Sequence, residues 1–295
     1  MIKSLVIGGS GFLGSHLIDL LSKKNHIVTN FDIKKSKWNN KSVKFVKGNI
    51  LNEKLISQVI KDKDYVFLFA GLSDLDEALV KPLKAIKMNI LATSLVSKYC
   101  VIHNVKRLIF ASSIYANSEE GGFYSSSKRA AEDFILQFSK KQKLKFTILR
   151  YGSLYGPRSN YKNGLYRILI NALKKKKLEY YGFPHNKRKY IDVETASKLT
   201  FISLKKKFEN KYLNLVGKEN IKILKLFQEI EKILSLSMKK KFYRKKIIGH
   251  YVVKPTRFRV KIGNNLFLKK EDTFFKKLKK FIMYLNDKNK IFKRL

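Results

Sequence analysis

The chain has 295 residues, of which 44% are hydrophobic and 13% aromatic, so it can bury a sizeable core and is not disordered. It contains no uninterrupted apolar run of about 18 residues, and we therefore expect no membrane span. The single cysteine, Cys100, excludes an intramolecular disulfide, and the first residues read as a strand and a turn, not as a secretory signal. These features predict a soluble, cytoplasmic protein.

The formal net charge of +42 is unevenly distributed, with +13 in residues 1–150 and +29 in residues 151–295. A charge of this size is typical of proteins that bind nucleic acid or membrane surfaces. However, lysine outnumbers arginine 54 to 10, and the lysine runs at 174–177, 205–207 and 239–241 are scattered. Base readers and phosphate clamps favour the bidentate fork of arginine. We therefore expect no nucleic-acid partner, although a basic second half suits a substrate that carries phosphates.

The first half of the chain alternates short apolar segments with amphipathic ones. Segments rich in Val, Ile, Leu or Phe predict strands at residues 3–8, 26–31, 43–46, 64–70, 107–112 and 145–149. Helical periodicity predicts helices at residues 13–23, 52–60, 82–103 and 124–141. Apolar strands that alternate with helices indicate a parallel sheet covered on both faces, which is a doubly wound α/β domain of the Rossmann type.

The pattern loosens after Gly156-Pro157. It predicts helices at residues 165–176 and 223–234, and a strand at residues 212–216 that returns to the sheet. From residue 239 the chain shows no clear period until a helical stretch at residues 274–284. We expect a nucleotide-binding domain at residues 1–157 and a smaller, partly interleaved substrate-binding lobe at residues 158–295.

The strongest motif is the turn Gly8-Gly-Ser-Gly11-Phe-Leu-Gly14, which follows the first predicted strand and begins the first predicted helix. In this context the glycines allow a tight turn, the approach of backbone N–H groups to a pyrophosphate, and packing of the helix on the sheet. Asp32 stands 18 residues after Gly14, where a carboxylate can accept hydrogen bonds from both ribose hydroxyls. Its charge would repel a 2′-phosphate, which favours NAD over NADP, although Lys34 and Lys35 follow closely.

A second motif, Tyr124-Ser-Ser-Ser-Lys128, is weak by itself because the chain has 15 tyrosines and 54 lysines. Further motifs surround it in order: Gly48-Asn49-Ile50, Phe69-Ala70-Gly71, Asn89, Ala111-Ser112-Ser113, Arg150-Tyr-Gly-Ser-Leu-Tyr-Gly-Pro157, Arg188-Lys-Tyr-Ile-Asp-Val-Glu194 and Tyr212-Leu-Asn-Leu-Val-Gly217. With the glycine turn and Asp32, they make the chain resemble the extended short-chain dehydrogenase/reductase family, in its NAD-dependent epimerase/dehydratase branch acting on nucleotide sugars. The resemblance covers residues 1–220 well and the tail poorly.

The resemblance implies a catalytic triad of Ser113, Tyr124 and Lys128. A phenol with a pKa of about 10 is a poor base near neutral pH unless a nearby ammonium group stabilises the phenolate. Lys128 would supply that charge and also bind the nicotinamide ribose, while Ser113 would hold the substrate oxygen that Tyr124 deprotonates. Tyr115 competes for the role of base, but Glu119 stands four residues after it where Tyr124 has a lysine. We therefore predict Tyr124 as the base.

The remaining site residues fall into two groups, and no metal ligands are predicted. The substrate-binding group is Ser113, Tyr124, Arg158 and Arg188, with the two arginines expected on the diphosphate. The cofactor-binding group comes from the glycine turn, the strand ends and the second motif: Gly8, Gly11, Phe12, Leu13, Gly14, Asp32, Asn49, Ile50, Ala70, Gly71, Asn89, Lys128 and Tyr151.

Three positions depart from the family pattern. The segment between Ser113 and Tyr124 is shorter than in many relatives, so part of the usual substrate loop is missing. Asn49 stands where an aspartate near the adenine is usual, and its side chain can still accept from the adenine amino group. Ser153 replaces a common asparagine, which affects recognition of the sugar.

An NAD-dependent nucleotide-sugar epimerase, similar to UDP-glucose 4-epimerase, is the predicted function. A 4,6-dehydratase is disfavoured because Ile114 and Tyr115, and not carboxylates, follow Ser113. A keto-sugar reductase would consume NADPH, against which Asp32 argues, and a basic nucleic-acid-binding protein without catalysis is the remaining alternative.

A homodimer is also expected, because relatives pair through two helices that correspond to residues 82–103 and 124–141. These two segments are rich in apolar side chains, more than one helix face needs against its own sheet: Ile86, Ile90, Val96, Phe134, Ile135 and Phe138.

Overall fold

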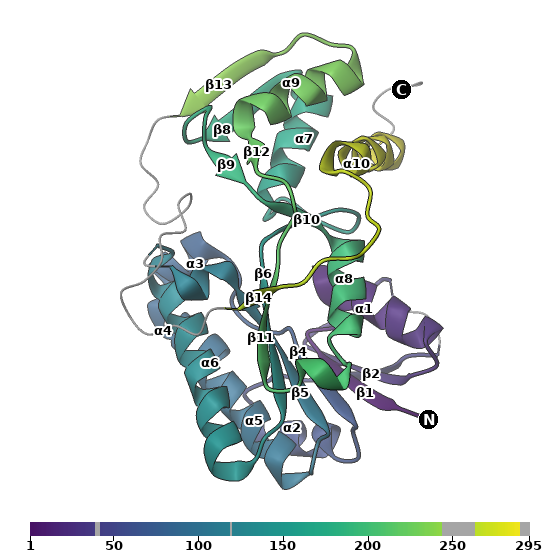
Figure 1. Cartoon of the computed structure of the whole chain (residues 1–295), viewed down its shortest axis with the longest axis vertical. Helices are drawn as coiled ribbons and strands as arrows, with labels where there is room; N and C mark the ends of the chain where they lie inside the picture. Colours follow the sequence, from purple (N-terminus) through teal and green to yellow (C-terminus); the bar gives the residue numbers. More distant parts are fainter. Residues whose placement is uncertain (39–41, 119, 244–262, 290–295) are drawn as a thin grey trace.

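The structure, a computed structural model, describes residues 1–38, 42–118, 120–243 and 263–289. Its centre is an eight-stranded sheet in which every neighbouring pair of strands is parallel (Figure 1). In spatial order the strands are β14 (Asn264–Asn265), β11 (Lys211–Leu215), β6 (Phe146–Tyr151), β5 (Arg107–Ser113), β4 (Tyr65–Leu68), β1 (Lys3–Ile7), β2 (Ile27–Asp32) and β3 (Lys44–Lys47). The doubly wound α/β fold predicted from the sequence is confirmed.

Helices cover both faces of this sheet, which explains why its strands are apolar on both sides. Helices α1 (Phe12–Lys23) and α8 (Val193–Ile202) lie on one face, and α2 (Glu53–Ile60), α5 (Ala92–Ile102) and α6 (Gly122–Gln142) on the other (Figure 1). The alternation is visible within β1, where Leu5 and Ile7 join one buried cluster and Val6 joins the other.

The helix predicted at residues 82–103 is divided by a wide turn. Helix α4 (Pro82–Ala85) runs into a π-helical segment, η1 (Ile86–Leu91), and then into α5. By length and composition this run is apolar enough to cross a membrane, but its side chains Val96 and Cys100 belong to the core against the sheet. A short helix that the sequence had not indicated, α3 (Leu75–Val80), precedes it.

A second lobe of the chain is built around a separate buried cluster. It contains α7 (Gly164–Lys175), α9 (Ile223–Leu234), α10 (Phe274–Asn289) and three small sheets (Figure 1). These pair β7 (Ser153–Tyr155) with β10 (Tyr190–Asp192), β9 (Lys187–Arg188) with β12 (Ile221–Lys222), and β8 (Lys177–Tyr181) with β13 (Lys239–Tyr243). Strand β13 lies in the tail, where the sequence showed no period.

The two parts of the chain are interleaved. Helix α8 and strand β11, both from the second half, complete the layers around the eight-stranded sheet, and the short strand β14 extends this sheet. The division at residue 157 remains a prediction.

The ammonium group of Lys277 connects helix α10 to the N-terminus of α8. Lys277 on α10 forms ion pairs with Asp192, which caps the N-terminus of α8, and with Glu271. Its Nζ also donates a 2.7 Å hydrogen bond to the hydroxyl of Thr195. All three charged side chains are less than one-fifth exposed, so water screens these contacts only in part. The pKa of Asp192 is lowered, since these bonds outweigh the effect of burial, and the pKa of Lys277 is raised by its two carboxylates against burial.

Replacing Lys277 by Met should lower the free energy of unfolding by about 1–3 kcal/mol, because two carboxylates in a half-buried junction lose charge-assisted hydrogen bonds. The difference from the wild type should be greatest between the ordinary pKa values of 3.8 for Asp192 and 10.5 for Lys277. It should shrink as pH falls through the lowered pKa of Asp192, and as pH rises through the raised pKa of Lys277. Urea unfolding at a series of pH values measures it.

The matched control is Lys276→Met. Lys276 is the neighbouring residue on α10, and its partner Asp272 lies near the surface, so this variant should be nearly as stable as the wild type. Equal losses in the two variants would contradict the role given to Lys277.

Candidate active site

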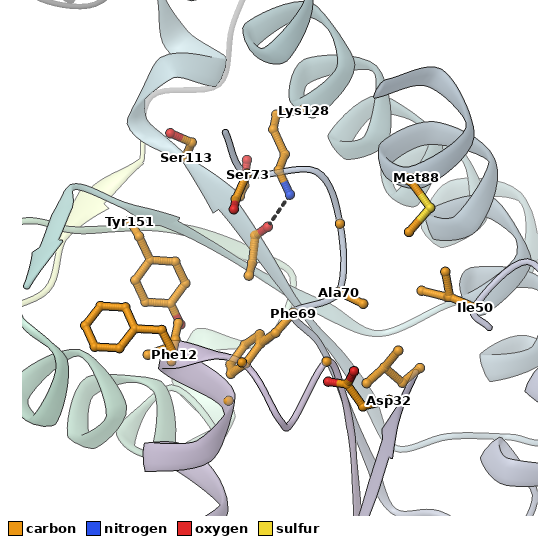
Figure 2. A pocket seen from close by; sticks show the side chains of 18 of the residues that line it. Phe12, Asp32, Ile50, Phe69, Ala70, Ser73, Met88, Ser113, Lys128 and Tyr151 are labelled. Carbon is orange, nitrogen blue, oxygen red and sulfur yellow. Dashed lines mark hydrogen bonds between the residues drawn. The ribbon is translucent and has the colours of Figure 1, made fainter. Parts of the chain in front are cut away.

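A cavity of about 500 Å³ lies where β1, β2, β4, β5 and β6 end at their carboxyl edge. The strand order reverses between β1 and β4, and crevices at such a point bind ligands in open α/β sheets. Residues from both predicted motifs line it, including Gly8, Gly14, Asp32, Ser113, Tyr124 and Lys128. Figure 2 shows Asp32 at one end of the cavity, with Ser113 and Lys128 at the other.

The glycines of the first turn are packed so closely that they leave no room for side chains. Gly8 has φ +87°, and a Cβ there would lie 2.4 Å from the backbone nitrogen of Ala70. A Cβ at Gly14 would lie 2.4 Å from the carbonyl oxygen of Gly8. Helix α1 begins directly after Gly11, which has no side chain to cap it, so the amides of its first turn face the cavity edge. Such a helix N-terminus binds an anion.

Asp32 closes β2 and is tied to the same turn. Its carboxylate accepts a 3.0 Å hydrogen bond from the backbone N–H of Ser10 and a 3.4 Å bond from that of Lys34. The carboxylate is partly exposed and lines the cavity, so lone pairs remain for a ligand hydroxyl. The glycine turn and the acidic residue therefore act at one end of the cavity, in the arrangement that the sequence predicted.

At the other end, Ser113 and Tyr124 meet through their hydroxyls. Ser113 is the last residue of β5, and its Oγ accepts a 3.2 Å hydrogen bond from the backbone N–H of Tyr115, which begins to turn the chain into a 3₁₀ segment. Tyr124 lies in the first turn of α6, next to the left-handed Gly121 and Gly122. Burial raises the pKa of Tyr124 to about 12, while its hydrogen bond with Ser113 acts in the opposite direction.

Lys128 lies one turn further along α6, and its ammonium group is buried. Nζ donates a 2.9 Å hydrogen bond to the carbonyl oxygen of Ala111, the dashed line in Figure 2, and lies 4.9 Å from the ring centre of Phe110. Burial lowers its pKa to about 8, and the charge of Glu132 opposes that shift.

The expected effect of Lys128 on the pKa of Tyr124 stays a prediction. In this structure the ammonium group of Lys128 is directed at Ala111, and the pKa of the Tyr124 phenol is raised. Desolvation of the phenol is the larger effect because Tyr124 is only 7% exposed.

The comparison with protein families settles the class. Residues 4–215 match the family model described as the NAD dependent epimerase/dehydratase family. The chain belongs to this family. It therefore belongs among the extended short-chain dehydrogenase/reductases that its motifs indicated, and the family description names the predicted cofactor, NAD.

Several curated relatives are similar in sequence, and several solved structures share the fold. The chain is 27% identical, over 80% of its length and 82% of the relative's, to a UDP-N-acetyl-alpha-D-glucosaminuronate decarboxylase of Bacillus cytotoxicus. It is 26% identical, over 73% and 77%, to a putative UDP-glucose 4-epimerase of Methanocaldococcus jannaschii. Among solved structures, the UDP-glucose 4-epimerase of Thermotoga maritima, with UDP-glucose, matches 98% of this chain and 100% of its own, with a TM-score of 0.83 and 22% identity.

A similar fold is found in MoeE5 in complex with UDP-glucuronic acid and NAD, which covers 97% of this chain and 99% of its own, with a TM-score of 0.83 and 20% identity. The relatives therefore include both decarboxylases and epimerases, which share the family but not the reaction.

Most of the predicted cofactor residues of this family member line the cavity. They are Gly8, Gly11, Phe12, Leu13, Gly14, Asp32, Asn49, Ile50, Ala70, Gly71, Lys128 and Tyr151. The amides at the start of α1 fit a pyrophosphate, and Asp32 fits a ribose diol, so the residues present suit NAD. Tyr151 contributes its ring to the cavity wall. Its hydroxyl is engaged elsewhere, in a 2.6 Å hydrogen bond with Thr200.

Asn89 lies behind the cavity wall. Its amide accepts from the backbone N–H of Leu72 at 2.8 Å and donates to the carbonyl of Leu72 at 3.0 Å and to the hydroxyl of Ser127 at 2.9 Å. These bonds join the loop after β4 to α6 between Tyr124 and Lys128. Among the described residues that line the cavity Asn89 is absent, so its contact with the cofactor remains a prediction.

The two predicted diphosphate ligands lie apart from the cavity lining of the described chain. Arg158 forms a 2.6 Å ion pair with Asp19 on α1, and its guanidinium lies 5.2 Å from the ring centre of Trp38. Arg188, largely covered by its neighbours, is directed at the hydroxyl of Tyr115 over 3.5 Å. Contact of either residue with a substrate remains a prediction.

The sequence did not indicate several lining residues that lie within three positions of the predicted ones: Phe31, Ile33, Phe69, Ser73, Met88, Ser112, Gly152 and Leu154. Their only signal was position, because parallel strands bring the residues after their carboxyl ends to one edge. Met88 could not be found in this way, since it reaches the cavity from the π-helical segment η1.

Asp32→Ala should weaken NAD by about 10- to 100-fold, because the ribose loses charge-assisted hydrogen bonds worth about 1.5–3 kcal/mol. Calorimetric titration with NAD and with NADP measures the change, and the wild type should prefer NAD. The variant should fold normally, since Asp32 stands at the partly exposed end of its strand. Asp62→Ala, an exposed turn residue, is the control and should leave both affinities unchanged. Tighter binding of NADP than NAD by the wild type would refute the assignment of Asp32.

Proposed function

We propose that this protein is an NAD-dependent epimerase of a nucleotide-diphosphate sugar, which acts by transient oxidation of one sugar hydroxyl. The observation that carries the proposal is that Ser113, Tyr124 and Lys128 share one cavity with the glycine turn and Asp32. A hydroxyl, a phenol and an ammonium group beside a dinucleotide site are the groups that oxidation of an alcohol needs.

The proposed reaction begins with removal of a proton and a hydride from the same carbon–oxygen unit. Tyr124, as phenolate, takes the proton of the sugar hydroxyl, while the hydroxyl of Ser113 donates a hydrogen bond to the same oxygen. The cofactor, when bound, accepts the hydride from the carbon and later returns it. The ketone of the sugar would turn its other face toward the cofactor site before the hydride is returned, and Tyr124 would then give the proton back to the same oxygen.

The raised pKa of Tyr124 makes this chemistry depend on nearby positive charge. With a pKa of about 12, the phenol is protonated near neutral pH. Two cations would favour its ionisation, namely the ammonium group of Lys128 and the cationic ring of oxidised NAD. Lys128 would bind the nicotinamide ribose in place of, or together with, the carbonyl of Ala111.

The other reactions of the family ask for different side chains or substrates. A dehydratase needs an acid and a base beside the triad, and Asp32, at the far end, is the acidic side chain among the described residues that line the cavity. A decarboxylase, as in the Bacillus cytotoxicus relative, needs a sugar that carries a carboxylate. A keto-sugar reductase would take up hydride from NADPH, which the charge of Asp32 disfavours.

The masses of the products separate all four reactions in one experiment. Purified protein is incubated with NAD, or with NADPH, and a panel of UDP- and dTDP-sugars that includes a uronic acid and a keto sugar, and the products are examined by mass spectrometry and NMR. An epimer has the mass of its substrate, a dehydratase product has lost water, a decarboxylase product has lost carbon dioxide, and a reductase product has gained two hydrogens. A product with altered mass, or no product from any nucleotide sugar, would overturn the epimerase proposal.

Tyr124→Phe should lower turnover by about 10²–10⁴-fold with little change in stability, because it removes only the proton-accepting oxygen and keeps the packed ring. Turnover is measured on the substrate found above, and stability by thermal unfolding. Lys128→Met should impair both turnover and NAD affinity, since the ammonium group has two roles.

Tyr115→Phe is the matched control, because the Tyr115 ring packs edge-to-face on Tyr124 with centroids 6.4 Å apart. It should leave turnover within a few-fold of the wild type. If Tyr115→Phe abolished turnover while Tyr124→Phe did not, the triad assignment would be wrong.

We also propose that the protein is a homodimer that pairs through the layer of α4, η1, α5 and α6. Within residues Pro82–Ile102, only 39% of the most apolar 18-residue stretch is buried inside the chain. Ile86 is 50% exposed and Phe134 on α6 is 47% exposed, whereas Val96 and Ile135 are in the core. The same layer of a second copy, related by a two-fold axis, would cover these exposed side chains on both protomers.

Light scattering at micromolar concentration should give the mass of a dimer. Phe134→Glu should shift it toward the monomer, because a carboxylate in an apolar interface is costly to desolvate. Phe267→Glu, at a residue 38% exposed in the second half of the chain, is the control and should remain dimeric. A monomeric wild type would contradict the proposal.

A further inference from the structure

We infer that the buried Glu132–Arg150 pair is a positioning device for the active site, which sets the depth of α6 against β5 and β6. The inference rests on the proposed function only for its turnover readout. Glu132 lies on α6, one turn after Lys128, and Arg150 lies on β6, one residue before Tyr151.

The pair forms the most enclosed ionic contact of the described chain. Arg150 is 1% exposed and Glu132 is 3% exposed. Nε of Arg150 donates a 2.9 Å hydrogen bond to Oε1 of Glu132, and Nη2 donates to Oε2, so the contact is a two-pronged fork. The hydroxyl of Ser112 on β5 donates to the same carboxylate. The guanidinium also lies 4.9 Å from the ring centre of Tyr212 on β11.

The three members of this network lie one residue or one helical turn from residues that line the cavity. Ser112 precedes Ser113, Arg150 precedes Tyr151, and the two strands are in register at both positions. Glu132 is four residues after Lys128, so both side chains lie on the same face of α6. The carboxylate therefore fixes, through one group, the relative positions of three elements that carry Ser113, Lys128 and Tyr151.

Stability alone is a poor explanation for this pair. Two ions lose much hydration when buried, and apolar residues of similar volume often replace such a pair at no loss of stability. Apolar side chains would not replace the geometry of this pair. Two parallel hydrogen bonds fix the distance and the angle between two elements, whereas aliphatic contacts allow the elements to shift against each other. The charge of Glu132 also opposes the fall in the pKa of Lys128, which supports its proximity to the ammonium group.

The test uses the double variant Glu132→Leu/Arg150→Met, which removes the charges together and leaves no buried ion unpaired. We expect it to fold, with NAD affinity lowered about tenfold and turnover lowered about 10- to 100-fold, while KM for the nucleotide sugar changes little. Its crystal structure should show Nζ of Lys128 displaced from the carbonyl of Ala111. Glu132→Asp/Arg150→Lys, which keeps both charges, should recover part of the loss.

The control is Arg107→Met/Glu209→Gln, at the opposite end of β5. Arg107 is 5% exposed, forms a 3.1 Å ion pair with Glu209, and caps carbonyls at the end of α8. This variant should lose stability and keep turnover and NAD affinity. The inference is overturned if the Glu132/Arg150 variant keeps wild-type NAD affinity and the Lys128 position, or if the control loses NAD affinity equally. Since NAD affinity and the crystal structure need no substrate, they decide the inference even if no nucleotide sugar reacts.

Discussion

Burial of one ammonium group, that of Lys128, is the constraint on which the active-site end of this protein depends. A cation taken out of water needs compensating contacts, and here they come from two elements of the fold. The carbonyl of Ala111 and the ring of Phe110 come from β5, and the carboxylate of Glu132 comes from the next turn of α6. Helix α6 must therefore lie close against the end of β5, and this contact brings Tyr124 to Ser113.

The burial of Tyr124 would make this proposed base dependent on the cofactor. Tyr124 lies in a nearly closed wall, where desolvation disfavours the phenolate, and the ammonium group nearest to it along the helix is directed at a carbonyl. In the proposed function, an effective base therefore forms only when more positive charge enters the cavity. Such coupling would keep the protein from deprotonating a sugar when no hydride acceptor is bound, because the phenol stays protonated until then.

The sequence predicted the parts of the site that depend on local structure. The glycine turn and Asp32 follow from steric limits and strand length, and both lie where their spacing indicated. Contacts between distant residues could not be predicted in this way. Arg158 pairs with Asp19, 139 residues earlier, and no local pattern indicates this partner; contact of Arg158 with a substrate stays a prediction.

The wide turn at Asn89 and the strand β13 have the same explanation. A π-helical segment has the composition of an ordinary helix, and the strand Lys239–Tyr243 is mostly lysine, so neither differs from its surroundings in periodicity. The direction of Lys128 could not be predicted either. Its spacing from Tyr124 suggests an ion pair with the phenolate, but the balance between burial and charge is decided by which carbonyl stands at the end of β5.

The few acidic residues of this basic chain have structural roles. There are 22 acidic residues and 64 basic ones. Asp19, Asp192 and Glu132 are among the acids that are partly or fully buried where two elements meet. Asp19 on α1 pairs with Arg158, and Asp192 at the start of α8 pairs with Lys277, so these two helices each hold a cation from the second half of the chain. Together with the pair of Glu132 and Arg150, these carboxylates fix the second lobe against α1 and α8, and α6 against β5 and β6. The lysines that matter for the fold and the site, Lys277 and Lys128, are thus the ones that a carboxylate accompanies.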